Sequence, residues 1–277
     1  MKLIFMSLAV YLILFIFIAP FLWMVLASFK TQQQILDTSN LLAITPSFSN
    51  FVNVFTQYEF MGFIGNSFLV AVASTFLGLL LGLPAAYSIA KYKQNGLGLL
   101  ILVARIVPGI SFLIPWFIIF SKLELIDTYT ALTLSHVLVT MPFIIWVMIP
   151  FFESLPGELE ESARIDGCTT TGALIRIILP ISGPGIITAS ILAFIFSWNN
   201  FMFSLILAGE NTKTLPIAIF NFLSYSEINW GGLMAASVII TLPVLIIALF
   251  MQRYIIAGMT GGRLKVEPKG GSRSFFL

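Results

Sequence analysis

The chain of 277 residues is 58% hydrophobic and 9% charged, with a mean hydropathy of +1.01 and a formal net charge of +2. A soluble fold cannot bury that much apolar surface, so the composition places the chain among integral membrane proteins. Cys168 is the only cysteine and His136 the only histidine, which excludes an internal disulfide and a Cys/His metal site. The small positive charge gives no indication of nucleic-acid binding.

Six apolar runs are long enough to cross a hydrocarbon core about 30 Å thick. Each has the length of a helix, so together they predict an all-α membrane protein with six transmembrane helices in residues 1–262. The first run is longer than the core of a signal peptide, and Phe29-Lys30 follows it instead of a small-residue cleavage site, so we expect a retained helix. The runs are 3–27, 68–90, 97–120, 129–152, 183–207 and 232–253.

The distribution of basic residues predicts the orientation in the membrane. With a cytoplasmic N-terminus, three lysines fall outside, Arg105 lies within the third span, and the other ten of the fourteen basic residues fall inside. Because cytoplasmic segments carry the excess of Lys and Arg, we expect both termini in the cytoplasm, with the loop 156–180 and the tail 263–277. The ten inside residues are Lys2, Lys91, Lys93, Arg164, Arg176, Arg253, Arg263, Lys265, Lys269 and Arg273.

A polar loop, residues 156–180, separates the fourth span from the fifth. Pro156-Gly157 marks a turn, and a short helix is expected over 158–165. Gly167 stands where a left-handed C-cap belongs. The expected helix has one modestly apolar face, formed by Leu159, Ala163 and Ile165.

A second short helix is expected after this turn, with Thr169 to Thr171 as its cap and Pro180 as its end. Two helices this short are unstable alone, so the loop is predicted to be a knob held by a partner surface. Its carboxylates predict a basic rim on that partner. The alternative is an amphipathic loop on the membrane surface, which is disfavoured because such helices favour Lys and Arg over Glu. The carboxylates belong to Glu158, Glu160 and Glu161.

Two sets of polar residues lie inside the predicted spans. Arg105 either snorkels to the inner interface or lines an aqueous pathway or gate, because a guanidinium in the membrane needs water or a partner. Trp198, Asn199, Asn200 and Phe201 lie two-thirds of the way along the fifth span. Amides beside aromatic rings can bind sugar hydroxyls and stack on a pyranose, but they can equally hydrogen-bond neighbouring helices.

The spacing of the polar loop resembles the EAA loop of permease subunits of bacterial ABC importers. Glu161-Ser162-Ala163 is followed after three residues by Gly167 and after nine more by Ile177-Ile178-Leu179-Pro180, with Ser162 in place of the middle Ala of the pattern. Gly183-Pro184-Gly185-Ile186 and the stretch Trp198 to Phe201 look like carbohydrate-uptake permeases of the MalG type. The resemblance covers nearly the whole chain, to about Gly262.

This resemblance implies a type I importer (MetI-like) permease fold with cytoplasmic coupling helices, in the inner membrane of a bacterium. The chain would pair with a second permease as a heterodimer, two ATPase subunits would hold one EAA loop each, and an external sugar-binding protein would deliver substrate. Glu161 and Asp166 would contact the ATPase, and Leu174, Ile177 and Leu179 would pack into its cleft. The implied coupling residues are Glu161, Ser162, Ala163, Asp166, Gly167, Leu174, Ile177, Leu179 and Pro180.

The sequence contains no Gly-x-x-x-x-Gly-Lys-Ser/Thr run, so ATP and Mg²⁺ are expected on a partner ATPase. We therefore expect a transport subunit and not an enzyme. An ABC permease for another solute, such as an amino acid or a polyamine, is the nearest alternative. A stand-alone secondary transporter is a more distant one, since it would need titratable groups near the membrane midplane, whereas the acidic residues fall at span ends or in loops.

Overall fold

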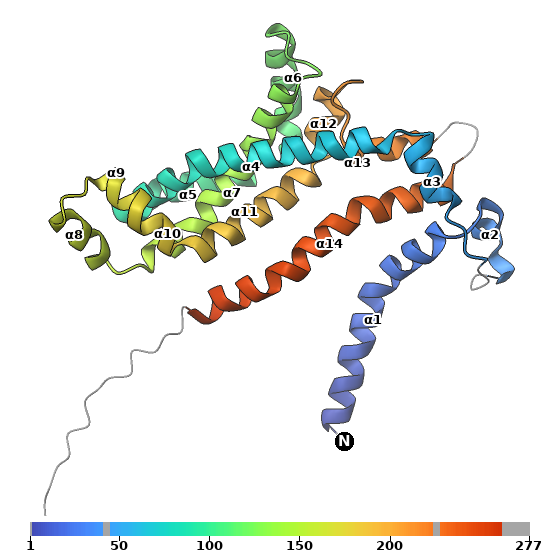
Figure 1. The fold of residues 1–277 in the computed structure, drawn as a ribbon, viewed down its shortest axis with the longest axis horizontal. Helices are drawn as coiled ribbons and strands as arrows, with labels where there is room; N and C mark the ends of the chain where they lie inside the picture. The colour runs from blue at the N-terminus through green and yellow to red at the C-terminus, as the bar shows by residue number, and fades with distance from the viewer. Residues whose placement is uncertain (1, 41–44, 224–227, 262–277) are drawn as a thin grey trace, which may run out of the picture.

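Helices form nearly all the regular structure in the computed structural model, which describes residues 2–40, 45–223 and 228–261 (Figure 1). Within these ranges no strand forms, and Leu223 and Ile228 make an isolated antiparallel bridge. The predicted all-α fold class is therefore confirmed. Four of the described helices are long and apolar enough to cross a membrane, or up to six helical spans are present if each of two bent helix pairs counts as one. The predicted tail 263–277 lies outside the described residues.

Three helices pack together at the centre of the fold. Glycines on one of them allow a close approach to the next, since a Cβ at Gly78 would lie 3.0 Å from Ile144 Cδ1 and one at Gly82 would lie 3.2 Å from Ile144 Cγ2. In a membrane, where lipid is as apolar as leucine, such small residues let helices gain van der Waals contact. The three helices are α4 (Phe60–Lys91), α7 (Tyr129–Glu153) and α11 (Gly183–Trp198).

The third predicted span, 97–120, is not one continuous helix. Helix α5 (Asn95–Ile106) is followed by a bend of 87° and then by η2 (Gly109–Phe112) and α6 (Leu113–Lys122). Val107 adopts an extended conformation, with ψ at 122°, because the residue before a proline is disfavoured in a helix. The bend leaves α5 against α7 and brings α6 against α12.

The fifth predicted span, 183–207, is also interrupted, because α11 ends early and α12 (Met202–Leu207) follows after a break. The Asn199 side chain donates to a carbonyl one turn earlier in α11, at 3.0 Å. Asn200 Oδ1 accepts the backbone N–H of Phe203 at 3.2 Å. Both amides thus compete with the helical hydrogen bonds of the main chain. The predicted span 183–207 therefore consists of two helices joined by a break.

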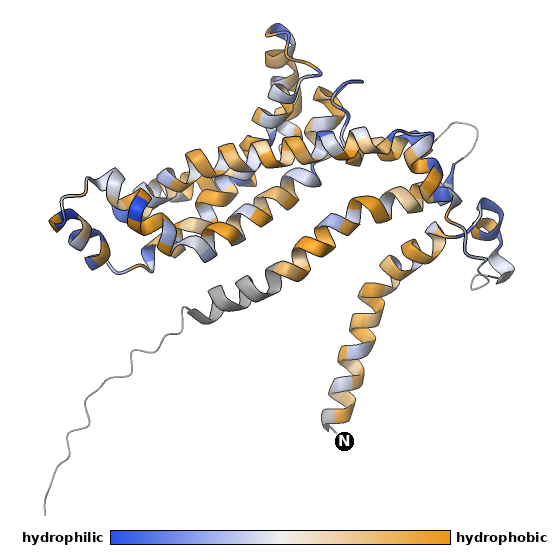
Figure 2. Ribbon diagram, viewed as in Figure 1, coloured by the Kyte–Doolittle hydropathy of each residue, from blue (hydrophilic) through white to orange (hydrophobic). Residues whose placement is uncertain are grey.

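Helix α14 (Trp230–Gly261) packs against α11, whereas α1 (Lys2–Ser28) contacts α14 and points away from the central three helices (Figure 1). Within the described part of α1, only Ala27 and Ser28 at its end are buried. The remaining apolar side chains of α1 are mostly exposed, and Figure 2 shows hydrophobic residues along its whole length. Such a surface is suited to contact with lipid or with another membrane helix.

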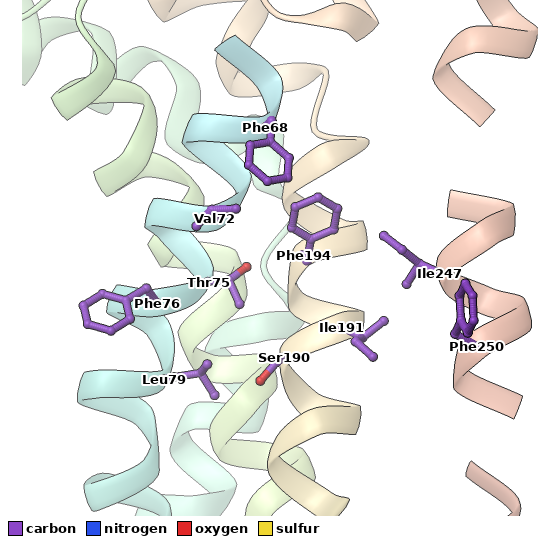
Figure 3. Close-up of a pocket in the computed structure, with 10 residues that line it drawn as sticks. All are labelled: Phe68, Val72, Thr75, Phe76, Leu79, Ser190, Ile191, Phe194, Ile247 and Phe250. Atoms are coloured by element: carbon purple, nitrogen blue, oxygen red, sulfur yellow. The ribbon is translucent and has the colours of Figure 1, made fainter. Parts of the chain in front are cut away.

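An apolar cavity of about 480 Å³ opens between α4, α11 and α14 (Figure 3). Four of the ten lining residues are phenylalanines: Phe68, Phe76, Phe194 and Phe250. Thr75 and Ser190 also line it, and the Ser190 hydroxyl donates to a carbonyl of its own helix. The lining carries no charged side chain, as expected for a surface that faces hydrocarbon.

Short helices gather at one end of the molecule, around the start of α14 (Figure 1). Asn50 joins them to α1, because its side-chain amide donates to the carbonyls of Ser28 and Lys30 at 2.9 and 2.8 Å. The opposite end carries α8 and α9, so the two ends of the bundle differ in structure. The short helices are α2 (Gln32–Leu36), η1 (Thr38–Asn40), α3 (Ser49–Thr56), α13 (Leu215–Ala218) and η4 (Ile219–Phe222).

Candidate coupling loop and pathway residues

The polar loop forms a helical hairpin where α4 ends and α11 begins (Figure 1). Its two arms contact each other through α8 and the pair α9 and η3. The second arm runs one residue beyond Pro180, the predicted end, and then bends by 80° into α11. The elements are α8 (Glu158–Ile165), α9 (Thr170–Ala173), the π-helical turn η3 (Leu174–Ile178) and α10 (Leu179–Ile181).

The turn between the two arms is fixed by local backbone bonds. Gly167 adopts a φ of +86°, the left-handed conformation predicted for it, and its N–H donates to the carbonyl of Arg164 at 3.1 Å. The N–H of Cys168 donates to the carbonyl of Ala163 at 2.9 Å, which completes a Schellman motif. The next helix is capped by Thr169, whose hydroxyl accepts the N–H at position 172 at 3.1 Å. The sequence alone therefore specifies this turn.

The inner face of the hairpin packs on the protein's own core, against α4 and α7. Leu174 is only 7% exposed there, so the prediction that it packs into a cleft of the ATPase is wrong. A side chain that fills the chain's own interior cannot also fill a partner's cleft. Ile177 is half-buried. The inner-face residues are Leu159, Ala163, Leu174, Ile178 and Leu179.

The outer face of the hairpin, which we call the docking face, combines acidic and apolar side chains. Ile165 is 86% exposed and Ile175 is 58% exposed. The prediction that Ile165 shares a face with Ala163 is wrong, because two residues further along a helix lie about 200° around its axis. Ile165 instead follows Glu161 by four residues, on the same side. The docking face consists of Glu158, Glu161, Ser162, Ile165, Asp166 and Ile175, all exposed.

Glu160 does not belong to the docking face, contrary to the prediction that it meets a partner. Its carboxylate accepts a hydrogen bond from the Tyr87 hydroxyl at 2.6 Å and forms an ion pair with Lys91, both at the end of α4. Burial alone would raise the pKa of Glu160, but the hydrogen bonds from Lys91 and Tyr87 lower it below its usual value. Glu160 is therefore an anion that faces the bundle.

Three of the four predicted pathway residues around the break in α11 have structural partners instead. Trp198 is buried, and its indole N–H donates to the carbonyl of Ile240 at 3.1 Å. Asn200 caps the start of α12, and the ring of Phe201 lies 5.6 Å from that of Phe220. Asn199 also bonds within the protein, to the carbonyl of Ile195, but it is the one of the four whose side chain is exposed. Of the two neighbouring amides, only that of Asn199 therefore lies at a surface.

Arg105 lies over aromatic rings from two other helices. Its guanidinium carbon is 4.8 Å from the ring centroid of Phe143 and 5.8 Å from those of Trp146 and Phe196. These are cation–π distances, so the charge has partners within the bundle without snorkelling. Trp146 and Phe196 are themselves exposed, and Asn199 follows Phe196 by three residues on α11. We call Arg105, Trp146, Phe196 and Asn199 the arginine face.

A buried polar chain, which sequence reasoning did not find, fastens the three central helices together. His136 Nδ1 on α7 lies 2.7 Å from Ser197 Oγ on α11, which in turn lies 2.8 Å from Ser74 Oγ on α4. The Thr140 hydroxyl donates to the backbone carbonyl of Ser74 at 3.3 Å. The only signal in the sequence for this chain of hydrogen bonds is a single histidine inside a span. The serines that bond with it and with each other lie far apart in the sequence, so their contact could not be predicted.

Comparison with known proteins identifies the family of the chain. The family of binding-protein-dependent transport system inner membrane components matches residues 78–261. The trehalose/maltose transport system permease protein MalG of Thermococcus litoralis is 34% identical over 255 residues, which cover 90% of this chain and 91% of that protein. The trehalose transport system permease protein SugB of Mycobacterium tuberculosis is 34% identical over 252 residues, with 89% and 92% covered.

A solved structure agrees in fold. The crystal structure of a bacterial ABC transporter involved in import of the acidic polysaccharide alginate contains a chain with a TM-score of 0.78. The sequence identity is 20%, and the match covers 91% of this chain and 95% of that one. The six-span permease fold predicted from the sequence is thereby confirmed.

The chain belongs to the binding-protein-dependent inner membrane components, the permease subunits of ABC transporters. It is a multi-pass membrane protein that depends on a binding protein, and the ATPase of such a transporter resides on separate subunits. Membership of this family removes the alternative of a stand-alone secondary transporter.

Proposed function

We propose that this chain forms half of the translocation pathway of an ATP-driven sugar importer, in a heterodimer with a second, similar permease. The observation that carries the proposal is the similarity to MalG and SugB, two sugar permeases, across about nine-tenths of the chain. In this arrangement two ATPase subunits bind ATP and Mg²⁺, and an extracytoplasmic binding protein delivers the sugar. No cofactor is assigned to this chain.

The docking face is the part of the chain that meets an ATPase subunit in this proposal. Its carboxylates, chiefly Glu161 and Asp166, complement a basic rim, while Ile165 and Ile175 supply apolar area that is exposed in the single chain. Gly167 and Ala163 hold the turn, and Pro180 lies in the last short helix of the second arm. ATP-driven closure of the ATPase pair then moves the hairpins together and tilts the spans as rigid bodies.

The arginine face is the part of the chain that lines the pathway in this proposal. Asn199 presents an amide, and Trp146 and Phe196 present ring surfaces, which suits a ligand with hydroxyl groups on one side and C–H groups on the other. Arg105 adds hydrogen-bond donors to the same region. Amides, rings and a guanidinium together match a sugar better than a purely apolar solute.

The orientation proposed here places the docking face and both termini in the cytoplasm. It is tested by replacing Cys168, the sole cysteine, with alanine and introducing Ile165→Cys. A membrane-impermeant maleimide should label position 165 only after the inner membrane is permeabilised. Glu124→Cys, in the loop after α6, is the matched control and should be labelled without permeabilisation. The reverse pattern would overturn the proposed orientation.

The function is tested by uptake into proteoliposomes that contain the chain with its cognate permease, ATPase and binding protein. A panel of sugars that includes trehalose and maltose is compared with glutamate and spermidine. We expect ATP-dependent uptake of a sugar, and no uptake when the ATPase subunit is omitted. Uptake of glutamate or spermidine, with no uptake of any sugar, would show that the substrate is an amino acid or a polyamine and not a sugar.

A further inference from the structure

The Glu160 carboxylate spans the space between the coupling hairpin and a central helix. We infer that Glu160, held by Lys91 and Tyr87, is a positioning residue that transmits movement of α8 to the end of α4. The inference rests on the proposed function, because it needs an ATPase to move the hairpin. It assigns Glu160 a role distinct from that of its neighbour Glu161.

The two neighbouring glutamates point to different surroundings. Glu160 accepts the Tyr87 hydroxyl at 2.6 Å and pairs with the Lys91 ammonium, and the two charged side chains are only 16% and 20% exposed. Glu161 is exposed on the docking face. Successive residues of a helix point about 100° apart, so one helix turn can grip a partner on one side and α4 on the other. Force applied at Glu161 therefore reaches α4 through one turn of α8.

A cavity beside Glu160 leaves part of the junction between α8 and α4 without apolar contact. A cavity of about 270 Å³ lies at the junction of α8 with α4 and α7, and its wall includes Lys91, Phe152, Leu155, Pro156 and Glu160. Close-packed side chains would transmit displacement directly, but space cannot. The hydrogen bonds of Glu160 are directional, whereas the apolar contact of Leu159 with the core is not. We therefore assign the polar connection between α8 and α4 to Glu160, beside the apolar packing of the inner face.

The link is also stronger than an ordinary surface ion pair. An exposed Lys–Glu pair contributes little, because water screens both charges and the side chains lose freedom. Here the carboxylate has two partners on successive turns of α4, with Tyr87 and Lys91 four residues apart. The Lys91 ammonium is also 5.6 Å from the Tyr87 ring centroid, which restrains it further.

The inference is tested in the complete transporter with ATP and orthovanadate as the probe, so that the identity of the sugar does not matter. Asn199→Cys in a Cys168→Ala background reports ATP-driven change at the arginine face through its rate of labelling by a maleimide. Into this protein we introduce Glu160→Gln, Lys91→Gln, or the reversed pair Glu160→Lys with Lys91→Glu. Glu153→Gln, at an exposed acidic residue that ends α7 and lies outside the docking face, is the matched control.

We expect the ATP-driven change in labelling rate to fall about five- to tenfold in Glu160→Gln and Lys91→Gln, a loss within the usual range for coupling between sites. The amount of ATPase subunit that co-purifies should stay at the level of the unmodified protein. The reversed pair should recover part of the change, and Glu153→Gln should retain all of it.

Two results would overturn the inference alone: an unaltered ATP-driven change in both Gln variants, or loss of the ATPase subunit from Glu160→Gln, which would make Glu160 a docking residue. Absence of any ATP-driven change in the unmodified transporter, or of any bound ATPase, would instead overturn the proposed function and the inference with it. The two failures are therefore distinguished by the unmodified protein.

Discussion

Asp127 accepts a hydrogen bond from the backbone N–H of Gly209 at 2.9 Å, which joins two loops that are 82 residues apart in the chain. The same carboxylate accepts four more hydrogen bonds, two each from the backbone and side chains of Asn211 and Thr212, at 2.7 to 3.2 Å. Gly209 is required for this approach, since a Cβ there would lie 2.6 Å from Asp127 Cγ. One carboxylate thus organises the segment after α12.

Asp127→Asn should destabilise this end of the protein. Burial would raise the pKa of Asp127, but its hydrogen bonds from Thr212, Asn211 and Gly209 lower it to about 2. Because the folded-state pKa is lowered, the stabilisation is fully present above the unfolded value of about 3.9 and is lost as the pH falls toward 2. At neutral pH we expect a loss of about 1–3 kcal/mol, measured by thermal unfolding in detergent.

The control for this variant is Glu124→Gln, three residues earlier in the same loop and exposed. It should unfold within about 0.5 kcal/mol of the unmodified protein. Equal stability of the Asp127→Asn protein and the control would show that the five hydrogen bonds contribute nothing net.

Substitutions on the docking face should release the ATPase without harming the permease. Glu161→Lys reverses a charge, and Ile165→Asp removes an exposed apolar side chain, so neither disturbs the interior. We expect each to weaken ATPase binding by about 1–3 kcal/mol, a typical cost for an important interface residue. Pull-down of the ATPase with the purified permease measures this, and full retention of the ATPase in both variants would contradict the assignment.

Gly167→Pro should uncouple ATP hydrolysis from uptake while leaving membrane insertion intact. Proline fixes φ near −65° and removes the N–H, whereas Gly167 has a φ of +86° and donates to Arg164. Gly157→Pro, at a φ of −62°, is the matched control, because proline tolerates that conformation. The ratio of sugar uptake to ATP hydrolysed measures the effect. A wild-type ratio of uptake to ATP hydrolysis in Gly167→Pro would show that the turn at Gly167 is not needed for coupling.

Asn199→Leu and Asn200→Leu should differ in effect. Asn199 is exposed beside the aromatic rings of the arginine face, so its loss should reduce sugar uptake with little change in thermal stability. Asn200 caps α12 through the N–H of Phe203, and its loss should cost about 1 kcal/mol of stability. Uptake assays and thermal unfolding on both proteins separate the two roles. Unchanged uptake in the Asn199 variant would leave that amide without a transport role.

His136→Phe should loosen the central helices. The substitution removes one of the two partners of Ser197 Oγ inside the bundle, and interhelical hydrogen bonds in membranes contribute about 0.6 kcal/mol on average and about 1.7 kcal/mol at most. We expect the free energy of unfolding to fall by an amount in that range, measured as a lower unfolding temperature, with normal ATPase binding. Ser135→Ala, buried on the same helix but bonded within it, is the control and should have a smaller effect.

The sequence predicts the helices, their membrane character and the turn at Gly167 well, because each rests on local pattern. Run length and hydropathy decide the first two, and a glycine at a C-cap decides the third. The breaks at Val107 and Asn199 coincide with Pro108-Gly109 and with the pair Asn199-Asn200, but a prediction from run length alone passes over both.

The direction of single side chains was the least predictable feature. Glu160 and Glu161 look equivalent in sequence, and only packing against α4 separates them. Leu174 was expected to meet a partner because the loop is polar, but it fills the chain's own core. His136 and Ser197 meet through tertiary packing of helices 61 residues apart, which no local pattern reveals.

The π-helical turn η3 gives the loop a strict residue count. The N–H of Leu179 donates to the carbonyl of Leu174, five residues back, so this turn holds one residue more than an α-helical turn. Leu174 and Ile178, four residues apart, both point inward, while Ile175 stays at the surface. Deleting one residue between Gly167 and this turn would rotate Leu174 and Ile178 by about 100° around the helix axis, away from the core. The nine residues between Gly167 and Ile177 therefore set which side of the second arm faces the bundle and which side faces outward.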